Sequence, residues 1–118
     1  MIVEMNLAHY RSICEPVQIC LEAREPGIPK NAISEARPGK VLRSFLLHGP
    51  SGSGKSSIAH ACLHLKRIVT EGKAYLHHVR PESVRCDYGD APTQIRMEIR
   101  VGSKTVVYAI ELNGNRIL

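Results

Sequence analysis

The residues of this chain best suited to chemistry form a glycine-rich loop that ends in a lysine and a serine. Residues 49–56 follow the pattern G-x-x-x-x-G-K-[ST] and read Gly49, Pro50, Ser51, Gly52, Ser53, Gly54, Lys55 and Ser56. The glycines allow the backbone to curl so that successive N–H groups point at one phosphate. Lys55 supplies a cation for the β- and γ-phosphates, and the Ser56 hydroxyl is suited to ligate Mg²⁺. This loop, with the adjacent Ser57, predicts a site for ATP and Mg²⁺.

A strand before the loop and a helix after it must position these groups. The apolar run at residues 45–47 lies within an expected strand at 41–48. A helix is expected from about residue 55 to residue 69, because apolar residues recur there at spacings of three and four. Gly72 supplies its end. The alternative interpretation, a flexible Gly/Ser linker, does not explain so regular a helical pattern.

Two strands and a long loop are expected before the phosphate loop. Residues 2–10 alternate apolar and polar side chains, as in a half-buried strand, and residues 17–23 are suited to a second strand. The short connection between them predicts a hairpin. Residues 24–40 contain three prolines and two glycines, which predicts a loop.

A second hairpin is expected over residues 94–118. Apolar and charged residues alternate over 94–101, a turn follows at Gly102, and residues 105–112 return as the partner strand. The pair Asn113 and Gly114 predicts another tight turn before a short strand. All of these elements together predict one α/β domain of the P-loop NTPase class. Its mixed sheet would carry the phosphate-loop helix, and the two hairpins would form an antiparallel β layer.

The N-terminal part of the chain resembles a known family. Residues 6–13, Asn-Leu-Ala-His-Tyr-Arg-Ser-Ile, are similar to the opening N-x-x-x-[FY]-R-S-[IF] of ABC-type ATPases of the SMC, RecF and OLD branch, often described only as AAA family ATPases. In those proteins a strand, the Arg-Ser pair, a second strand, a Pro/Gly-containing segment, an apolar strand and the phosphate loop follow in this order. The resemblance covers residues 2 to about 70, and is looser beyond, where the second hairpin looks like an inserted arm.

This resemblance implies roles for several residues. It places Arg11 beside the nucleotide and gives Lys55 and Ser56 their phosphate and Mg²⁺ contacts. An ordinary exposed turn arginine is the alternative for Arg11. Ser51 departs from the family, which usually has Asn at that position. The resemblance also implies that the full protein couples ATP binding to work on DNA or to a defence effector.

The groups that hydrolyse ATP are missing from the pattern. No Asp-Glu pair follows four apolar residues; Asp87 and Asp90 lie in an expected loop, and Glu111 is better explained as a solvent-facing hairpin residue. The family's signature motif, glutamine loop and switch histidine are also absent. We therefore expect ATP binding without hydrolysis, by the N-terminal part of an incomplete ABC-type ATPase lobe that self-associates or needs a C-terminal or partner chain. A small nucleotide kinase and a non-catalytic regulatory module stay open as alternatives.

Composition narrows the choice of partner and location. The formal net charge of +5 suits a nucleotide first, with DNA as an open alternative. With no Trp and one Phe, a base-stacking platform for single strands is poorly supported. No signal or membrane-spanning segment is evident, and cysteines without C-x-x-C spacing predict free thiols in the cytoplasm. His60 and His64 lie four apart, but no third metal ligand is evident.

Overall fold

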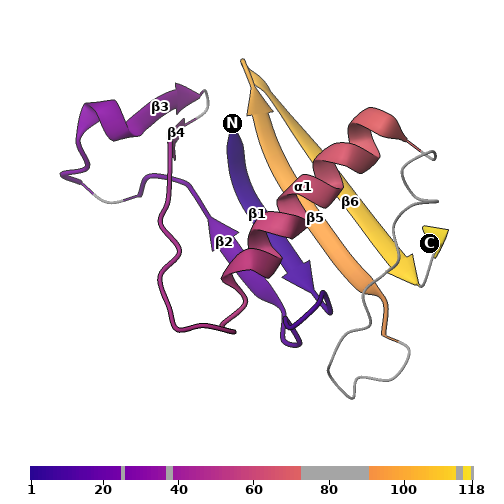
Figure 1. The fold of residues 1–118 in the computed structure, drawn as a ribbon. Helices are drawn as coiled ribbons and strands as arrows, with labels where there is room; N and C mark the ends of the chain where they lie inside the picture. The colour runs from indigo at the N-terminus through magenta and orange to yellow at the C-terminus, as the bar shows by residue number, and fades with distance from the viewer. Residues whose placement is uncertain (25, 37–38, 73–90, 114–115, 118) are drawn as a thin grey trace.

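One antiparallel sheet forms the main body of the protein, and one helix crosses one of its faces (Figure 1). The computed structural model describes all residues except 25, 37–38, 73–90, 114–115 and 118. The sheet has the strand order β2-β1-β5-β6-β7. Its strands are β1 (Ile2–Ala8), β2 (Val17–Cys20), β5 (Thr93–Val101), β6 (Lys104–Asn113) and β7 (Arg116–Ile117).

The two expected hairpins join into this single sheet. β1 pairs antiparallel with β2, and β5 pairs antiparallel with β6, as the alternating patterns predict. The two hairpins meet where β1 pairs with β5, with Met5 opposite Met97 and Leu7 opposite Ile95. Because side chains alternate between the faces of a strand, these four residues lie on one face, and the polar residues between them lie on the other.

Helix α1 (Lys55–Glu71) covers the apolar face of the sheet. Ala61 and Leu65 are buried in one cluster with side chains of β1 and β5. The helix ends at Gly72, whose φ of 64° favours glycine and whose N–H donates to the Ile68 carbonyl at 3.0 Å. The predicted helix, its apolar face and its glycine stop are therefore confirmed. Within the described parts of the chain, no helix is long and apolar enough to cross a membrane.

The predicted α/β class is wrong. Every strand pairing that the structure describes is antiparallel, so the mixed sheet of a P-loop NTPase or of an ABC-type lobe is not present. Residues 44–50 form no strand in front of the phosphate loop, and α1 packs on β1 and β5 instead. The apolar run at 45–47 finds no neighbouring strand among the described residues, so its backbone has no ladder to join.

The same apolar run is open to solvent. Phe45 is 46% exposed and Leu46 is 88% exposed. The expectation that the chain self-associates or binds a partner chain stays a prediction.

A second, smaller sheet occupies the segment predicted as a loop at 24–40. After a short 3₁₀ helix (Lys30–Ala32), β3 (Ile33–Ala36) and β4 (Gly39–Leu42) form an antiparallel hairpin. Val41 of β4 is fully buried against Val3 and Leu21. Burial of this one β-branched side chain anchors the hairpin. The prolines and glycines of the segment predict a loop instead, so the loop prediction is wrong for β3 and β4.

The cysteines differ from one another. Cys20 and Cys62 carry free thiols, as predicted. Cys14 is disulfide-bonded, so the prediction is wrong for this residue. Cys86 lies outside the described residues. A cytoplasmic location stays a prediction.

A buried arginine holds the small hairpin close to the main sheet. The Arg100 side chain is 8% exposed, and its Nη2 donates to Glu22 Oε1 at 2.9 Å. Arg24 donates to the other oxygen of the same carboxylate, also at 2.9 Å. A Cβ at Gly39 would lie 3.1 Å from Arg100 Nη1, so β4 approaches this guanidinium closely. Glu22 is thus the link between β5 and the hairpin.

We expect Glu22→Gln to lower stability at neutral pH by about 1–2 kcal/mol, because the buried guanidinium loses its charged acceptor. Hydrogen bonds from Arg24 and then Arg100 lower the pKa of the Glu22 carboxyl. Its contribution is therefore fully present above the ordinary value of about 4.5 and is lost as pH falls through the lower, folded-state pKa. Urea unfolding at pH 7 and in steps below pH 4.5 measures both effects. If the variant lost stability with acid as steeply as the wild type over this range, the assignment to Glu22 would fail.

Candidate functional site

The predicted phosphate loop has the backbone geometry that its glycines suggest. Gly52 and Gly54 have φ angles of 81° and 91°, in the left-handed region that side chains disfavour. Glycine suits position 49 for a different reason, because a Cβ there would lie 2.9 Å from Ser53 Oγ. Ser53 N–H donates to the Pro50 carbonyl at 3.3 Å and closes the turn. The loop is therefore a defined curve rather than an extended linker.

Helix α1 begins immediately after this curve and supplies open donors. Gly54 is its N-cap and offers no side-chain acceptor, and the first turn contains no acidic residue. The first helical hydrogen bond joins the Ile58 N–H to the Gly54 carbonyl at 3.2 Å. The N–H groups of Lys55, Ser56 and Ser57 consequently lie at the positive end of the helix without intrahelical acceptors. This donor set suits an anion.

Lys55 spans the loop from its first helical position. Its Nζ donates to the carbonyls of Gly49 at 2.8 Å and Pro50 at 2.5 Å, and to Ser53 Oγ at 3.1 Å. Three acceptors from the two sides of the curve thus hold one ammonium group. The positive charge is fixed within the loop, next to the open helix N-terminus, and Ser56 beside it is exposed. The ATP and Mg²⁺ site stays a prediction at this loop.

The turn that contains Arg11 lies against this loop. Tyr10 and Ile13 exchange backbone hydrogen bonds of 3.0 and 2.9 Å, which makes Arg11 and Ser12 the two turn residues. Ile13 Cγ1 would lie 3.5 Å from a Cβ at Gly54. The Arg11 guanidinium lies 5.8 Å from the centre of the Tyr10 ring. The structure therefore brings the turn to the phosphate loop, while the described contact of the guanidinium is with the tyrosine.

Arg11 has an unusual backbone conformation for its residue type. Its φ is 53°, a left-handed value that costs an L-residue with a side chain about 1–2 kcal/mol. We expect Arg11→Gly to be more stable than Arg11→Ala by about 1 kcal/mol, because only glycine adopts this angle without strain. Thermal melts of both variants give the difference. Because both lack the guanidinium, they are matched controls for ATP affinity; an alanine variant as stable as the glycine variant would show that no strain is stored here.

Sequence reasoning missed two residues of this region. Ser12 Oγ lies 3.2 Å from Ser57 Oγ, and Ile13 packs beside Gly54. The Arg-Ser pair is the signal in the sequence that points to this turn, and the family resemblance implies a role for its arginine alone. A hydroxyl pair 45 residues apart in sequence leaves no local pattern.

The candidate carboxylates are not part of the loop. Glu111 is exposed on β6, and its Oε1 accepts a hydrogen bond of 2.5 Å from Gln94 Nε2 on β5. This agrees with a solvent-facing hairpin residue. Asp87 and Asp90 lie outside the described residues.

No metal cluster is found in the described ranges. No three His, Cys, Asp or Glu side chains gather there in a way that holds a metal ion. His64 Nδ1 instead lies 2.8 Å from the Tyr10 hydroxyl, with the two rings edge to face. Ser56 is the predicted Mg²⁺ ligand through its exposed hydroxyl, and the metal would need the phosphates as its other ligands.

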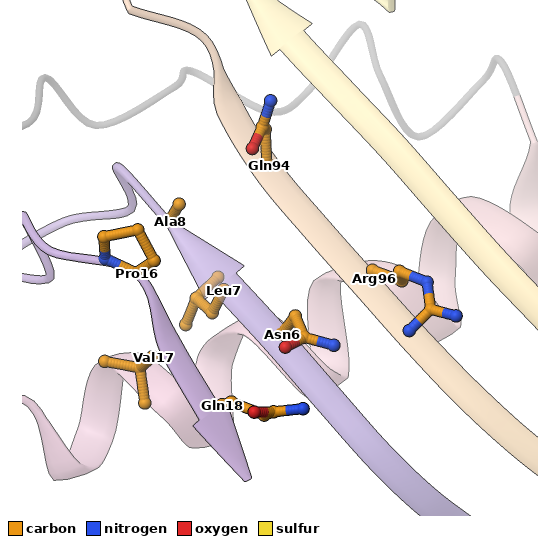
Figure 2. Close-up of a pocket in the computed structure, with 8 residues that line it drawn as sticks. All are labelled: Asn6, Leu7, Ala8, Pro16, Val17, Gln18, Gln94 and Arg96. Carbon is orange, nitrogen blue, oxygen red and sulfur yellow. The ribbon is translucent and has the colours of Figure 1, made fainter.

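The opposite face of the sheet carries a hollow of about 410 Å³ that is lined by both polar and apolar side chains (Figure 2). Asn6, Gln18 and Arg96 lie side by side on it, from three adjacent strands. Glu4 accepts hydrogen bonds from Asn6 at 2.6 Å and from Arg96 at 3.3 Å. Bonds from Asn6 and then Gln18 lower the pKa of Glu4. These groups largely satisfy one another, so the hollow is less suited to a ligand than the phosphate loop.

Comparison of the chain with protein-family models gave no match, and searches of curated proteins and of solved structures gave none either. The likeness to ABC-type ATPases therefore depends only on the residues quoted for it.

Proposed function

We propose that this chain binds ATP with Mg²⁺ at the loop formed by residues 49–56, as a nucleotide-binding unit related to the ABC-type ATPases. The observation that carries the proposal is the loop conformation. Gly52 and Gly54 adopt left-handed angles directly before a helix whose first turn has open N–H groups and no acidic residue. The proposal concerns the loop and its helix, and does not extend to a parallel sheet.

Each group has a definite role in this proposal. The N–H groups of the loop and of the first turn of α1 donate to phosphate oxygens, and Lys55 offsets their charge. Ser56 offers its hydroxyl to Mg²⁺, which when bound neutralises part of the phosphate charge. The turn that carries Arg11 packs beside Gly54 through Ile13, and in this proposal the Arg11 guanidinium leaves the Tyr10 ring to supply a further cation. The positive net charge of the chain favours the approach of the nucleotide.

Binding without hydrolysis is the expected behaviour of these residues. Turnover needs a carboxylate to orient water and to hold Mg²⁺ through its water ligands, and such groups usually act beside the γ-phosphate. Glu111, which follows an apolar run, is bonded to Gln94 across the hairpin. In this structure Glu111 is therefore engaged on the sheet and does not take this role.

The experiment measures binding and turnover on the same preparation. Calorimetric titration with ATP and Mg²⁺ should give saturable binding, and a phosphate-release assay should give none above the buffer rate. Absence of binding would contradict the proposed function. Steady phosphate release that Lys55→Ala abolishes would contradict the lack of hydrolysis and make Glu111 or Asp87 the next carboxylates to replace.

A further inference from the structure

The turn between β1 and β2 is docked on the phosphate-loop helix at three places. Ile13 packs at Gly54, Ser12 Oγ lies 3.2 Å from Ser57 Oγ, and the Tyr10 hydroxyl lies 2.8 Å from His64 Nδ1. The helix partners lie along one side of α1, because residues three, four and seven apart share a face. The fully buried Ala61 lies between them and allows the turn to approach closely.

The docked turn has two strained residues. His9 and Arg11 have φ angles of 52° and 53°, and they flank the anchored Tyr10. Non-glycine residues keep such angles only where surrounding contacts hold them, and such strain gathers at functional sites. Contacts with α1 hold the turn on one side, and hydrogen bonds from Thr93 Oγ1 to the His9 carbonyl at 2.6 Å and between His9 Nδ1 and the Pro92 carbonyl at 3.1 Å tie it to the start of β5. The docking on α1 is therefore one part of the arrangement that keeps these angles.

Ser57 connects this arrangement to the phosphate site. Its side chain is 7% exposed, while its N–H is among the open donors of the first helical turn. The Ser57 hydroxyl lies within hydrogen-bond distance of the Ser12 hydroxyl, which belongs to the docked turn. A displacement of Ser12 would thus change the position of Ser57, which directly follows the predicted Mg²⁺ ligand Ser56.

We infer that Ser12 is a positioning residue for the phosphate site. Its hydroxyl acts through Ser57 to fix the first turn of α1, and so couples nucleotide binding to the conformation of the strained turn. The inference rests on the proposed function and adds to it a residue outside the loop motif. Coupling is reciprocal, so bound nucleotide also stabilises the docked turn.

A double-mutant cycle with Mg·ATP as the probe tests this inference. We expect Ser12→Ala to weaken binding about threefold to tenfold, the effect of one neutral hydrogen bond. Ser57→Ala should have a similar effect, and the double variant should be no weaker than the single ones. Ser12→Thr, which keeps the hydroxyl, should restore the wild-type affinity. Ser103→Ala, in the exposed turn between β5 and β6, is the matched control and should bind as the wild type does.

Two further measurements separate positioning from general destabilisation. The nucleotide-free Ser12→Ala variant should melt within a few degrees of the wild type, because the Ser57 hydroxyl can turn to a carbonyl of its own helix. Amide hydrogen exchange of residues 10–13 should slow when the wild type binds Mg·ATP, and should slow less in Ser12→Ala.

The outcomes are distinct. Wild-type affinity in Ser12→Ala, additive effects in the cycle, or a weakened Ser12→Thr variant would overturn the inference while leaving the proposed function intact. A loss of affinity that only follows a loss of melting temperature would also overturn it. No binding by the wild type would overturn the proposed function and this inference together.

Discussion

Replacing Lys55 with alanine is expected to weaken the binding of Mg·ATP by about 2–4 kcal/mol, or roughly thirtyfold to a thousandfold. The reason is that one ammonium group has two tasks. It supplies the charge closest to the phosphates, and it ties the carbonyls of Gly49 and Pro50 across the loop. The alanine variant loses the charge and the tether at once. Isothermal titration calorimetry gives the affinity directly.

Two companion variants separate these tasks. Lys66→Ala removes the same charge from an exposed position on α1, away from the loop, and should bind almost as the wild type does. Lys55→Gln keeps N–H donors for the loop carbonyls without the charge, and should lie between the wild type and the alanine variant. Equal affinity in wild type and Lys55→Ala would show that the nucleotide, if it binds, is held elsewhere.

Leu65→Ala should lower the free energy of unfolding by about 2–5 kcal/mol. Leu65 is 2% exposed and lies in the cluster between α1 and the apolar face of β1 and β5. Truncation leaves a cavity at the point where the helix is attached to the sheet, and the surrounding side chains only partly fill it. Leu63→Ala, 45% exposed on the same helix, is the control and should cost less than about 1 kcal/mol. Urea titrations of the three proteins measure both values.

The same series tests the corrected fold. In the α/β arrangement that the sequence predicts, α1 would pack on the strand at 41–48, and Leu46 would lie in the core. In the structure Leu46 is 88% exposed, so Leu46→Ala should leave stability nearly unchanged. If Leu46→Ala destabilised the protein as much as Leu65→Ala, the antiparallel arrangement would be wrong.

Local patterns were sufficient for the elements that depend on near neighbours. The spacing of apolar residues in α1, the glycine at its end and the period-two alternation of β1 and β5 are each encoded within a few residues. The loop glycines are of the same kind, since they predict a curled backbone, and Gly52 and Gly54 take left-handed angles there. These features could therefore be predicted before any tertiary contact was known.

Pairing between distant segments could not be predicted in this way. The apolar run at 45–47 has the composition of a buried strand, but a strand also needs neighbours, and its sequence does not say whether they exist. The pairing of β1 with β5 joins residues about 90 positions apart, as in the Leu7–Ile95 pair. The β3–β4 hairpin depends on the burial of Val41, and the Ser12–Ser57 contact depends on a docked turn. Each of these is decided by packing rather than by local pattern.

The most direct test of nucleotide binding at this loop is a map of backbone amide shifts by NMR as ATP and Mg²⁺ are added to the wild-type chain. We expect the largest changes at Gly52, Gly54, Lys55, Ser56 and Ser57, because their N–H groups would exchange water for phosphate oxygens. Amides of β6, on the far part of the sheet, should change little. Unchanged loop amides at saturating nucleotide, or changes confined to the hollow around Asn6 and Arg96, would contradict nucleotide binding at the loop.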